Sequence, residues 1–465
     1  MPHVVVVGGG LSGLSVAFRL TQSAPDITVT VLDPEPRVGG NIRTENHGGF
    51  TVECGPNGFL DNKPFLTGLC IDLGLTDRAV PASDGSRKNR YLYLNGKLRK
   101  LPRGPLSLLT SPLLSFKSKW KLLTEAWRKP PPHVDPDETV SAFIARRTTQ
   151  QVADVFGDAM VTGIHGGDPE LLSVAGAFPR LVQMERDAGS IIRGFNRAAA
   201  ERRARAKANG EKPTPVRMWS FREGLREMVT AFENHLGKSL ITGVRVATIE
   251  QSAGVTAWEV RGERRSWGAD AVVLACPAYE QAAILNDIDP ELAGEVSAIP
   301  YNRIAVVALG YRQQDCPGSQ DGFGYIAPQN TRRDILGVQW CSSIFPDRAP
   351  PGSVLWRALC GGVHRTDVVD WDDDTLARAV HQEIKLAMGV TGEPYFRRIV
   401  RWQAAIPQYV VGHVERVARI DALASKHAGL FLGGNAYRGV AMSDCAEQGE
   451  VVAERVRAFL AGGAA

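Results

Sequence analysis

The chain has 465 residues, 44% of them hydrophobic and 22% charged, which is the balance of a folded globular protein rather than a disordered one. One hydrophobic core does not organise this length, so we expect two or three domains. The net charge of +4 is too small to argue for nucleic-acid binding. Seven scattered cysteines without a C-x-x-C pair predict neither a disulfide framework nor a zinc site, and they favour a reducing, cytoplasmic compartment. No apolar run of about 18 residues is present, so we predict no membrane-spanning helix.

The first fourteen residues, MPHVVVVGGGLSGL, organise the rest of the chain. Four valines, Val4 to Val7, predict a strand buried on both faces, and apolar residues at helical spacing follow the glycines. The G-x-G-x-x-G spacing allows a tight strand-to-helix turn, close approach of a pyrophosphate and close helix packing. A second predicted strand, 27–32, ends where a ribose-binding carboxylate is expected. We therefore predict a dinucleotide site formed by Gly8, Gly9, Gly10, Leu11, Ser12, Gly13 and Asp33.

A second glycine motif, PRVGGNIRT at 36–44, indicates which dinucleotide binds. Its R-x-G-G-x-x-x-T pattern resembles the continuation motif of FAD-binding oxidoreductases of the amine oxidase and phytoene desaturase type. A second glycine pair lets the chain pass close to the cofactor, and a guanidinium can neutralise a phosphate. The predicted cofactor is FAD, and the contacts expected from this motif are Arg37, Gly39, Gly40 and Asn41.

Residues 106–127 place apolar side chains on one predicted helical face and interleave them with basic residues. Pro112 is expected to split the stretch into two helices, and Pro130 to Pro132 to end it. Such a face suits a membrane-surface helix, and packing inside a helical domain is the other interpretation. The apolar residues are Leu106, Leu109, Leu113, Phe116, Trp120, Leu123 and Trp127. The basic residues are Lys97, Arg99, Lys100, Arg103, Lys117, Lys119, Lys121, Arg128 and Lys129.

The second half of the chain alternates glycine turns with apolar strands. Residues 163–168, GIHGGD, are predicted to form a glycine loop. Residues 301–403 predict a mixed sheet interrupted by one helix at 372–388, whose aromatic residues suit a flat apolar ligand. Residues 271–275 predict another buried strand, and 429–449 predict a strand, a glycine turn and a helix that return the chain to the flavin.

Several signatures in order along the chain resemble the oxygen-dependent, FAD-containing protoporphyrinogen oxidase family: NRYLY, TGIHGGD, FPRLVQMER, GFGYIAP, IPQYVVGH and GNAYRGVAMSDC. The resemblance runs nearly end to end. It implies a mixed α/β fold with three domains and peripheral association with the inner face of the cell membrane. The implied domains are a discontinuous Rossmann-like FAD-binding domain (1–62, 217–285 and 425–465), a substrate-binding domain with a six-stranded mixed sheet (63–92 and 286–424), and a helical membrane-binding domain (93–216). Because the family is often dimeric, a homodimer is also an expectation.

The resemblance implies an enzyme of heme and porphyrin biosynthesis that oxidises protoporphyrinogen IX to protoporphyrin IX. Six electrons leave in three flavin cycles, and three O2 become three H2O2. The flavin carries the redox step, so we predict no catalytic side chain and no metal ligand. Further implied cofactor contacts are Gly55, Pro56, Asn57, Gly58, Val246, Gly434, Val440, Ala441 and Met442. Implied substrate contacts are Arg90, which would face a propionate, and Gly163, Phe323, Ile326 and Leu359.

The sequence departs from the family at one cofactor position and leaves three alternatives open. The family usually has glutamate in place of Asp33, and we expect a small shift to absorb the shorter reach. The first alternative is the same oxidation of coproporphyrinogen III to coproporphyrin III. The second is a flavin amine oxidase or carotenoid desaturase, against which GNAYRGVAMSDC and GFGYIAP argue. The third is a flavoprotein that binds tetrapyrroles without oxidising them.

Overall fold

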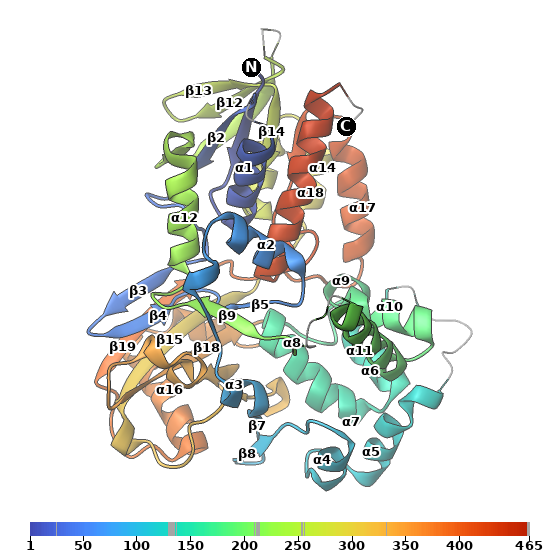
Figure 1. Ribbon diagram of the computed structural model, residues 1–465, viewed down its shortest axis with the longest axis vertical. Coiled ribbons are helices and arrows are strands. Elements are labelled where there is room, and N and C mark those ends of the chain that lie inside the picture. Colours follow the sequence, from blue (N-terminus) through green and yellow to red (C-terminus); the bar gives the residue numbers. More distant parts are fainter. Residues whose placement is uncertain are drawn as a thin grey trace.

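The computed structural model describes residues 1–24, 26–128, 135, 137–208, 210, 214–252, 254, 256–331 and 333–462. Its upper part in Figure 1 is a layered α/β unit near which both chain ends lie. Its lower part places a large sheet beside a group of helices. The predicted mixed α/β fold is confirmed.

A five-stranded parallel sheet forms the centre of the upper part, in the order β10-β2-β1-β14-β20. Alternate valines of the first strand enter two different cores, Val4 and Val6 on one face and Val5 and Val7 on the other, so the sheet is buried on both sides. The predicted strands at 4–7, 27–32 and 271–275 are confirmed. The strands are β1 (His3–Val7), β2 (Thr28–Asp33), β10 (Leu240–Thr242), β14 (Ala271–Leu274) and β20 (Leu430–Leu432).

Different elements cover the two faces of this sheet. Packed with Val4 and Val6 are α1 (Leu11–Ser23), α2 (Pro64–Asp72), α12 (Arg226–Leu236) and α18 (Met442–Leu460). Packed with Val5 and Val7 are α13 (Ala278–Leu285), α14 (Pro290–Ser297), α17 (His413–Ala424) and an antiparallel sheet of β11 (Val246–Gln251), β12 (Trp258–Gly262) and β13 (Ser266–Ala269).

The lower sheet has seven strands in the order β19-β15-β18-β17-β16-β7-β8. The expected number of six strands is therefore one too few, because both strands of the hairpin of residues 90–100 join the edge of the sheet. Asn95 and Gly96 turn that hairpin with positive φ angles of 52° and 71°, as a tight two-residue turn requires. The elements are β7 (Arg90–Leu94), β8 (Lys97–Lys100), β15 (Arg303–Arg312), β16 (Gly324–Ile326), β17 (Gly337–Gln339), β18 (Ser353–Gly362), β19 (Phe396–Trp402) and the covering helix α16 (Asp373–Met388).

Side chains alternate along β18 and give the two faces of this sheet different surroundings. Trp356 and Ala358 join the core beneath α16. Leu355 packs with residues of β4 (Phe50–Glu53), and Arg357 donates to the backbone at the end of β4 and just after it, Glu53 O and Gly55 O. Leu359, two residues on, shares this second face, which is turned toward the upper unit.

Short elements join the two parts. They form a two-stranded sheet and a three-stranded sheet that run between the upper and lower units. These connecting elements are β3 (Thr44–His47), β4 (Phe50–Glu53), β5 (Phe59–Leu60), β6 (Ala79–Pro81), β9 (Met218–Phe221), α3 (Asp84–Lys88) and α15 (Cys341–Ile344).

The helical group lies between residues 105 and 208. Pro112 separates its first two helices, as predicted. Lys129 and the predicted stop at Pro130 to Pro132 lie outside the described residues. The helices are α4 (Pro105–Thr110), α5 (Phe116–Leu123), α6 (Val140–Arg147), α7 (Gln150–Val152), a π-helical turn (Ala153–Gly157), α8 (Asp158–His165), α9 (Val174–Ala177), α10 (Pro179–Ala188) and α11 (Ile191–Ala208).

Five of the seven residues on the predicted apolar face of α4, α5 and the turn after them are exposed to solvent. Their exposed fractions are 78% for Leu106, 46% for Leu109, 76% for Phe116, 60% for Trp120 and 78% for Trp127. Leu113 is buried and Leu123 packs partly against the helical core. Internal packing therefore does not explain most of this face. Within the described ranges, no helix is long and apolar enough to cross a membrane.

Candidate active site

The turn from β1 into α1, Gly8 to Gly13, forms a glycine cradle. Its Gly13 side has no room for a side chain, whereas its Gly10 side is open. A Cβ placed on Gly13 would lie 2.0 Å from the carbonyl oxygen of Gly8, so the helix packs directly on the turn. A Cβ on Gly10 would find its nearest atom 4.0 Å away, at Gly40. Gly10 caps α1 without a side-chain hydrogen bond, which leaves first-turn N–H groups and the positive helix end for phosphates. Leu11 and Ser12 form the start of that helix.

Asp33 ends β2 beside the cradle and is 6% exposed. Gly9 N–H donates to its Oδ2 at 2.7 Å, and Glu35 N–H donates to its Oδ1 at 2.9 Å. Burial raises the pKa of this carboxyl. Asp33, which is shorter than the glutamate usual in the family, thus binds the backbone of the glycine turn. Its predicted contact with the ribose would use the remaining lone pairs of the carboxylate.

The second glycine motif lies against the first. Gly39 N–H donates to Gly9 O at 2.6 Å, and Gly40 adopts a positive φ of 55° beside Gly10. Arg37 donates to Gly40 O at 2.9 Å and, more weakly, to Val38 O and Ile42 O at 3.3 Å. The guanidinium therefore stabilises its own turn, and its contact with a phosphate stays a prediction.

The Gly55–Gly58 turn lies between the two units. A Cβ on Gly55 would lie 1.9 Å from Asn41 O, and one on Gly58 would lie 2.6 Å from Trp219 O, so no side chain fits at either position. Asn57 is 4% exposed, and its amide nitrogen has no partner in the described part of the chain. Pro56 lies between these residues. An unpartnered buried donor beside a close-packed glycine turn suits a ligand rich in acceptor atoms, as an isoalloxazine is.

The remaining predicted cofactor residues come from distant parts of the chain. Gly434 follows β20 with a positive φ of 115°, and a Cβ there would find no atom nearer than 3.7 Å. Val440 and Ala441 precede α18, which Met442 begins. Val246 begins β11, two residues after Val244 N–H donates to Asp33 O at 2.9 Å. The chain thus brings these segments to the carboxyl ends of the parallel strands, where dinucleotides bind in such sheets.

Four of the five predicted substrate residues lie on or next to neighbouring strands of the lower sheet, and the fifth, Gly163, lies on α8. Ile326 of β16 and Leu359 of β18 are both paired with Gly337 of β17, so they form one row. A Cβ on Gly163 would lie 2.9 Å from Ile326 Cδ1, which places α8 against that row. Arg90 pairs with Gly324, next to Phe323.

Arg90 carries a charge without a counter-charge. It is exposed, and among the described residues it forms no ion pair. Its guanidinium carbon lies 4.6 Å from the centre of the Phe323 ring, a cation–π distance. The protein atoms around the guanidinium remove part of its hydration, which lowers the pKa of Arg90. A solvent-reachable guanidinium that protein atoms surround is suited to a carboxylate brought in by a ligand.

The predicted 163–168 loop is partly wrong, because α8 continues through His165. The helix ends where Gly166 adopts a positive φ of 54°, the left-handed end that glycine favours. His165 is 1% exposed, its ring contacts Phe178 and Tyr409, and Nδ1 has no described partner. Sequence spacing gave no signal for this buried histidine.

His165 makes stability depend on pH. Burial lowers its pKa from 6.5 to about 4, so the unfolded chain takes up the proton first as pH falls. The contribution of His165 to the free energy of unfolding is fully present above pH 6.5. It is lost as the pH falls to about 4, and the total loss is about 3 kcal/mol. His165→Phe should remove this loss. Chemical unfolding of both proteins across this range would show a pH-dependent gap, and parallel curves would contradict the prediction.

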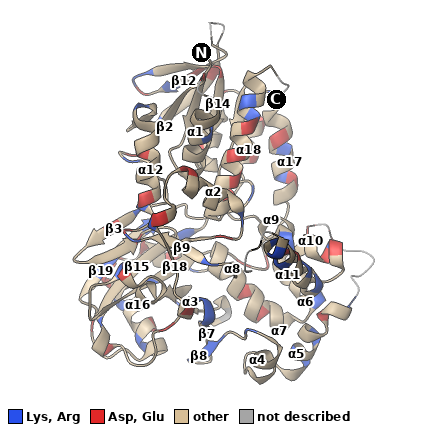
Figure 2. Ribbon diagram, viewed as in Figure 1, with Lys and Arg blue, Asp and Glu red and all other residues tan. Residues whose placement is uncertain are grey.

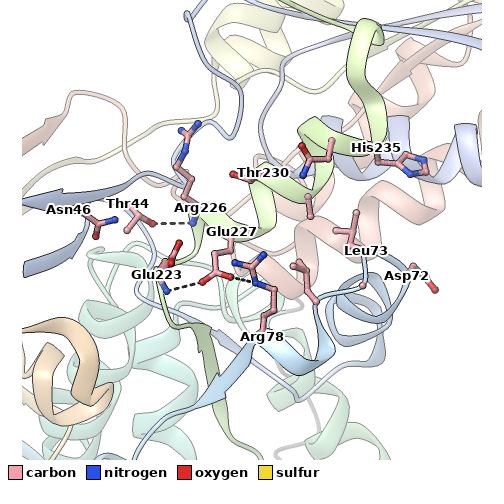
Figure 3. A pocket seen from close by; sticks show the side chains of 14 residues that line it. Thr44, Asn46, Asp72, Leu73, Arg78, Glu223, Arg226, Glu227, Thr230 and His235 are labelled. Atoms are coloured by element: carbon pink, nitrogen blue, oxygen red, sulfur yellow. Dashed lines mark hydrogen bonds and ion pairs between the residues drawn. The ribbon is translucent and has the colours of Figure 1, made fainter.

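A surface cleft of about 580 Å³ lies elsewhere, beside α12 (Figure 3). Its charged groups bind one another: Arg78 Nε lies 2.7 Å from Glu227, and Glu223 N–H donates to Glu227 at 2.8 Å. None of the predicted cofactor or substrate residues lines it. We assign it no role.

The glycine cradle, the acid after β2 and the second glycine pair together define a dinucleotide-binding flavoprotein of the Rossmann-like class, and FAD fits them. Residues 11–457 match the family described as flavin containing amine oxidoreductase, and the chain belongs to that family. It is an oxidoreductase whose cofactor is FAD.

Named relatives align over nearly all of this chain. Protoporphyrinogen oxidase 1 of Arabidopsis thaliana is 31% identical over 98% of this chain and 88% of its own length. Coproporphyrinogen III oxidase of Bacillus subtilis is 27% identical over 98% of both. The fold is similar to a putative protoporphyrinogen oxidase from Exiguobacterium, with a TM-score of 0.83 and 22% identity over 99% of each chain.

Proposed function

We propose that this protein oxidises protoporphyrinogen IX to protoporphyrin IX. Arg90 carries the proposal: its guanidinium lies over Phe323, and it forms no ion pair among the described residues. It is two residues from Leu92, which pairs with Ile326 in the apolar row that also contains Leu359. A tetrapyrrole macrocycle with propionates needs this combination of an apolar wall and a cation. Relatives named protoporphyrinogen oxidase support the assignment.

The proposed reaction removes six electrons and six protons from the macrocycle and passes them to three O2, giving three H2O2. When bound, FAD accepts two electrons in each cycle. The chain's own residues orient the macrocycle against the Gly55–Gly58 turn, here called the flavin turn, and exclude water. No described side chain is assigned as acid or base.

Coproporphyrinogen III is the second candidate substrate, since relatives in Bacillus subtilis and Staphylococcus aureus carry that name. It bears four propionates where protoporphyrinogen bears two, so further cations at the site would favour it. Aerobic turnover of the two porphyrinogens by the purified protein can be monitored by porphyrin fluorescence and by peroxide formation. The porphyrinogen that is oxidised faster is the substrate that this test supports. No turnover of either with FAD bound would contradict the oxidase.

Arg90→Ala should raise KM for the porphyrinogen about tenfold or more, because a charge-assisted hydrogen bond contributes about 1.5–3 kcal/mol. Bound FAD should be unchanged, since the strand that carries Arg90 is at the far side of the lower sheet from the glycine cradle. Steady-state kinetics with the FAD absorbance as reference checks both. Arg312→Ala, at the end of β15, is the control. An unchanged KM for Arg90→Ala would remove this residue from the site.

We also propose that α4, α5 and the turn after them dock on a membrane surface at the cytoplasmic side. The support is the exposed apolar face, which carries two tryptophans, and the basic residues near it. Figure 2 shows basic residues on β8, α5 and α11 of this lower region. We further propose the three-domain division and the homodimer that the family resemblance implies.

Vesicle sedimentation tests the membrane contact. The double variant Phe116→Ser, Trp120→Ser should bind vesicles with anionic lipids about tenfold or more weakly, because each aromatic side chain contributes about 1.5–3 kcal/mol when buried. Leu386→Ser on α16 is the matched control, since Leu386 is similarly exposed at 59%. Equal binding of the double variant and the control would contradict the proposal.

A further inference from the structure

A buried cationic cluster lies behind the Gly55–Gly58 turn. It consists of Glu53, Arg348 and Arg357, whose side chains come from β4, the segment before β18, and β18 itself. Their exposed fractions are 2%, 1% and 3%. Two guanidiniums and one carboxylate make the cluster net positive, in a place where buried charges are usually balanced.

The two arginines have different roles in this cluster. Arg348 lies 3.6 Å from Glu53 and donates to Arg222 O and Ser220 Oγ at 2.9 and 2.8 Å. These contacts face β9 and hold the connecting sheet. Arg348 therefore has both a counter-charge and a local structural task.

Arg357 has no carboxylate within ion-pair distance in the described chain. Its Nη1 donates to Glu53 O at 2.6 Å and to Gly55 O at 2.8 Å, and its Nη2 donates to Gln339 Oε1 at 2.8 Å. Its Nε is buried without a described partner. The guanidinium thus ties the beginning of the flavin turn to the sheet that carries Leu359.

We infer that Arg357 is a positioning residue that fixes the flavin turn relative to the substrate wall, and that its uncompensated charge raises the electron affinity of the bound flavin. Two-electron reduction adds negative charge to a flavin, so a nearby buried cation favours the reduced form. The inference rests on the FAD assignment for the potential and on the proposed porphyrinogen oxidation for KM.

The midpoint potential of bound FAD, measured against a reference dye, tests the charge. Arg357→Met should shift the reduction equilibrium about tenfold toward oxidised flavin, which is about 30 mV for a two-electron couple. Arg312→Met, which removes an exposed cation at the end of β15 and outside the cluster, is the control and should leave the potential unchanged. An unchanged potential in Arg357→Met, or an equal shift in both variants, would overturn the inference.

Arg357→Lys separates the two parts and stays informative where the Met variant does not fold. Lysine keeps the charge, but its ammonium cannot reproduce the planar fork that joins Glu53, Gly55 and Gln339. The potential should stay near wild type while KM for the porphyrinogen rises about tenfold. A wild-type KM would overturn the positioning role. A protein that never oxidises porphyrinogens but shows the potential shift contradicts the proposed function and leaves the charge effect standing.

Discussion

Gly13→Ala should weaken FAD binding about tenfold or more. The new Cβ would lie 2.0 Å from Gly8 O and 3.3 Å from Ala275 Cβ, so α1 must move away from β1 and carry the phosphate-binding helix end with it. Forcing extra volume into a packed site costs about 1–3 kcal/mol or more, and tenfold in affinity is about 1.4 kcal/mol. We expect FAD content after purification to fall about tenfold or more, measured by flavin absorbance per protein.

Gly68→Ala is the control for this substitution. Gly68 also lies within a helix, α2, but a Cβ there would have no atom within 4 Å. Alanine favours the helix by about 0.5–1 kcal/mol, so FAD content should stay unchanged and stability should not fall. A Gly13→Ala protein with a full complement of FAD would show that the cradle tolerates a side chain.

Glu125→Ala should destabilise the protein by about 3–5 kcal/mol, because it leaves the buried guanidinium of Arg147 without its closest partner. The two side chains are 1% and 2% exposed, and Arg147 Nε donates to Glu125 at 2.8 Å. Glu125 also accepts from Ser190 Oγ at 2.6 Å and from the first N–H groups of α11, Ile191 at 3.1 Å and Ile192 at 3.0 Å. The carboxylate therefore joins α5's following turn to α6 and α11.

Urea unfolding checks this cost, with Glu201→Ala as control. The Glu201 side chain is 55% exposed, and within the described residues it pairs with Arg197 of its own helix alone, at 3.0 Å, so its loss should change stability by about 0.5 kcal/mol or less. Since Glu125 precedes the exposed Trp127, the variant should also weaken vesicle binding. Equal stability of the two variants would show that Arg147 finds compensation, for which Glu185 at 3.3 Å is the nearest candidate.

The parts of the fold that follow local rules were predictable from sequence. β1, α1 and β2 were predicted because the valine run, the glycine spacing and Asp33 all lie within the first 33 residues. The lower sheet was predicted as a class but not in its strand number, because edge pairing depends on where a hairpin docks. The end of α8 was misplaced, since a glycine at 163 suggested a loop although the left-handed residue is Gly166.

Contacts across long stretches of chain were outside the reach of the sequence. Arg357 lies about 300 residues from the turn that it holds, and it stands in an apolar strand where one arginine gives little warning of a buried task. Glu125 gave no signal either, because its four partner residues come from two segments that follow much later in the chain, Arg147 and residues 190–192. Motif spacing indicated the first cofactor residues, Gly8 to Gly13 and Asp33, whereas the family resemblance indicated the later cofactor residues and all of the substrate residues.

The order of strands in the upper sheet has a consequence for biosynthesis. Its edge strand β20 and the helix α18, which packs on α1, come from residues 430–460, so they are translated long after β1 and α1. The apolar side of α1 therefore stays uncovered until nearly the whole chain has been translated, and such surfaces are prone to association. We therefore expect FAD to be loaded only after residues 430–460 have been made, and a nascent chain that stops before them to be a substrate for chaperones.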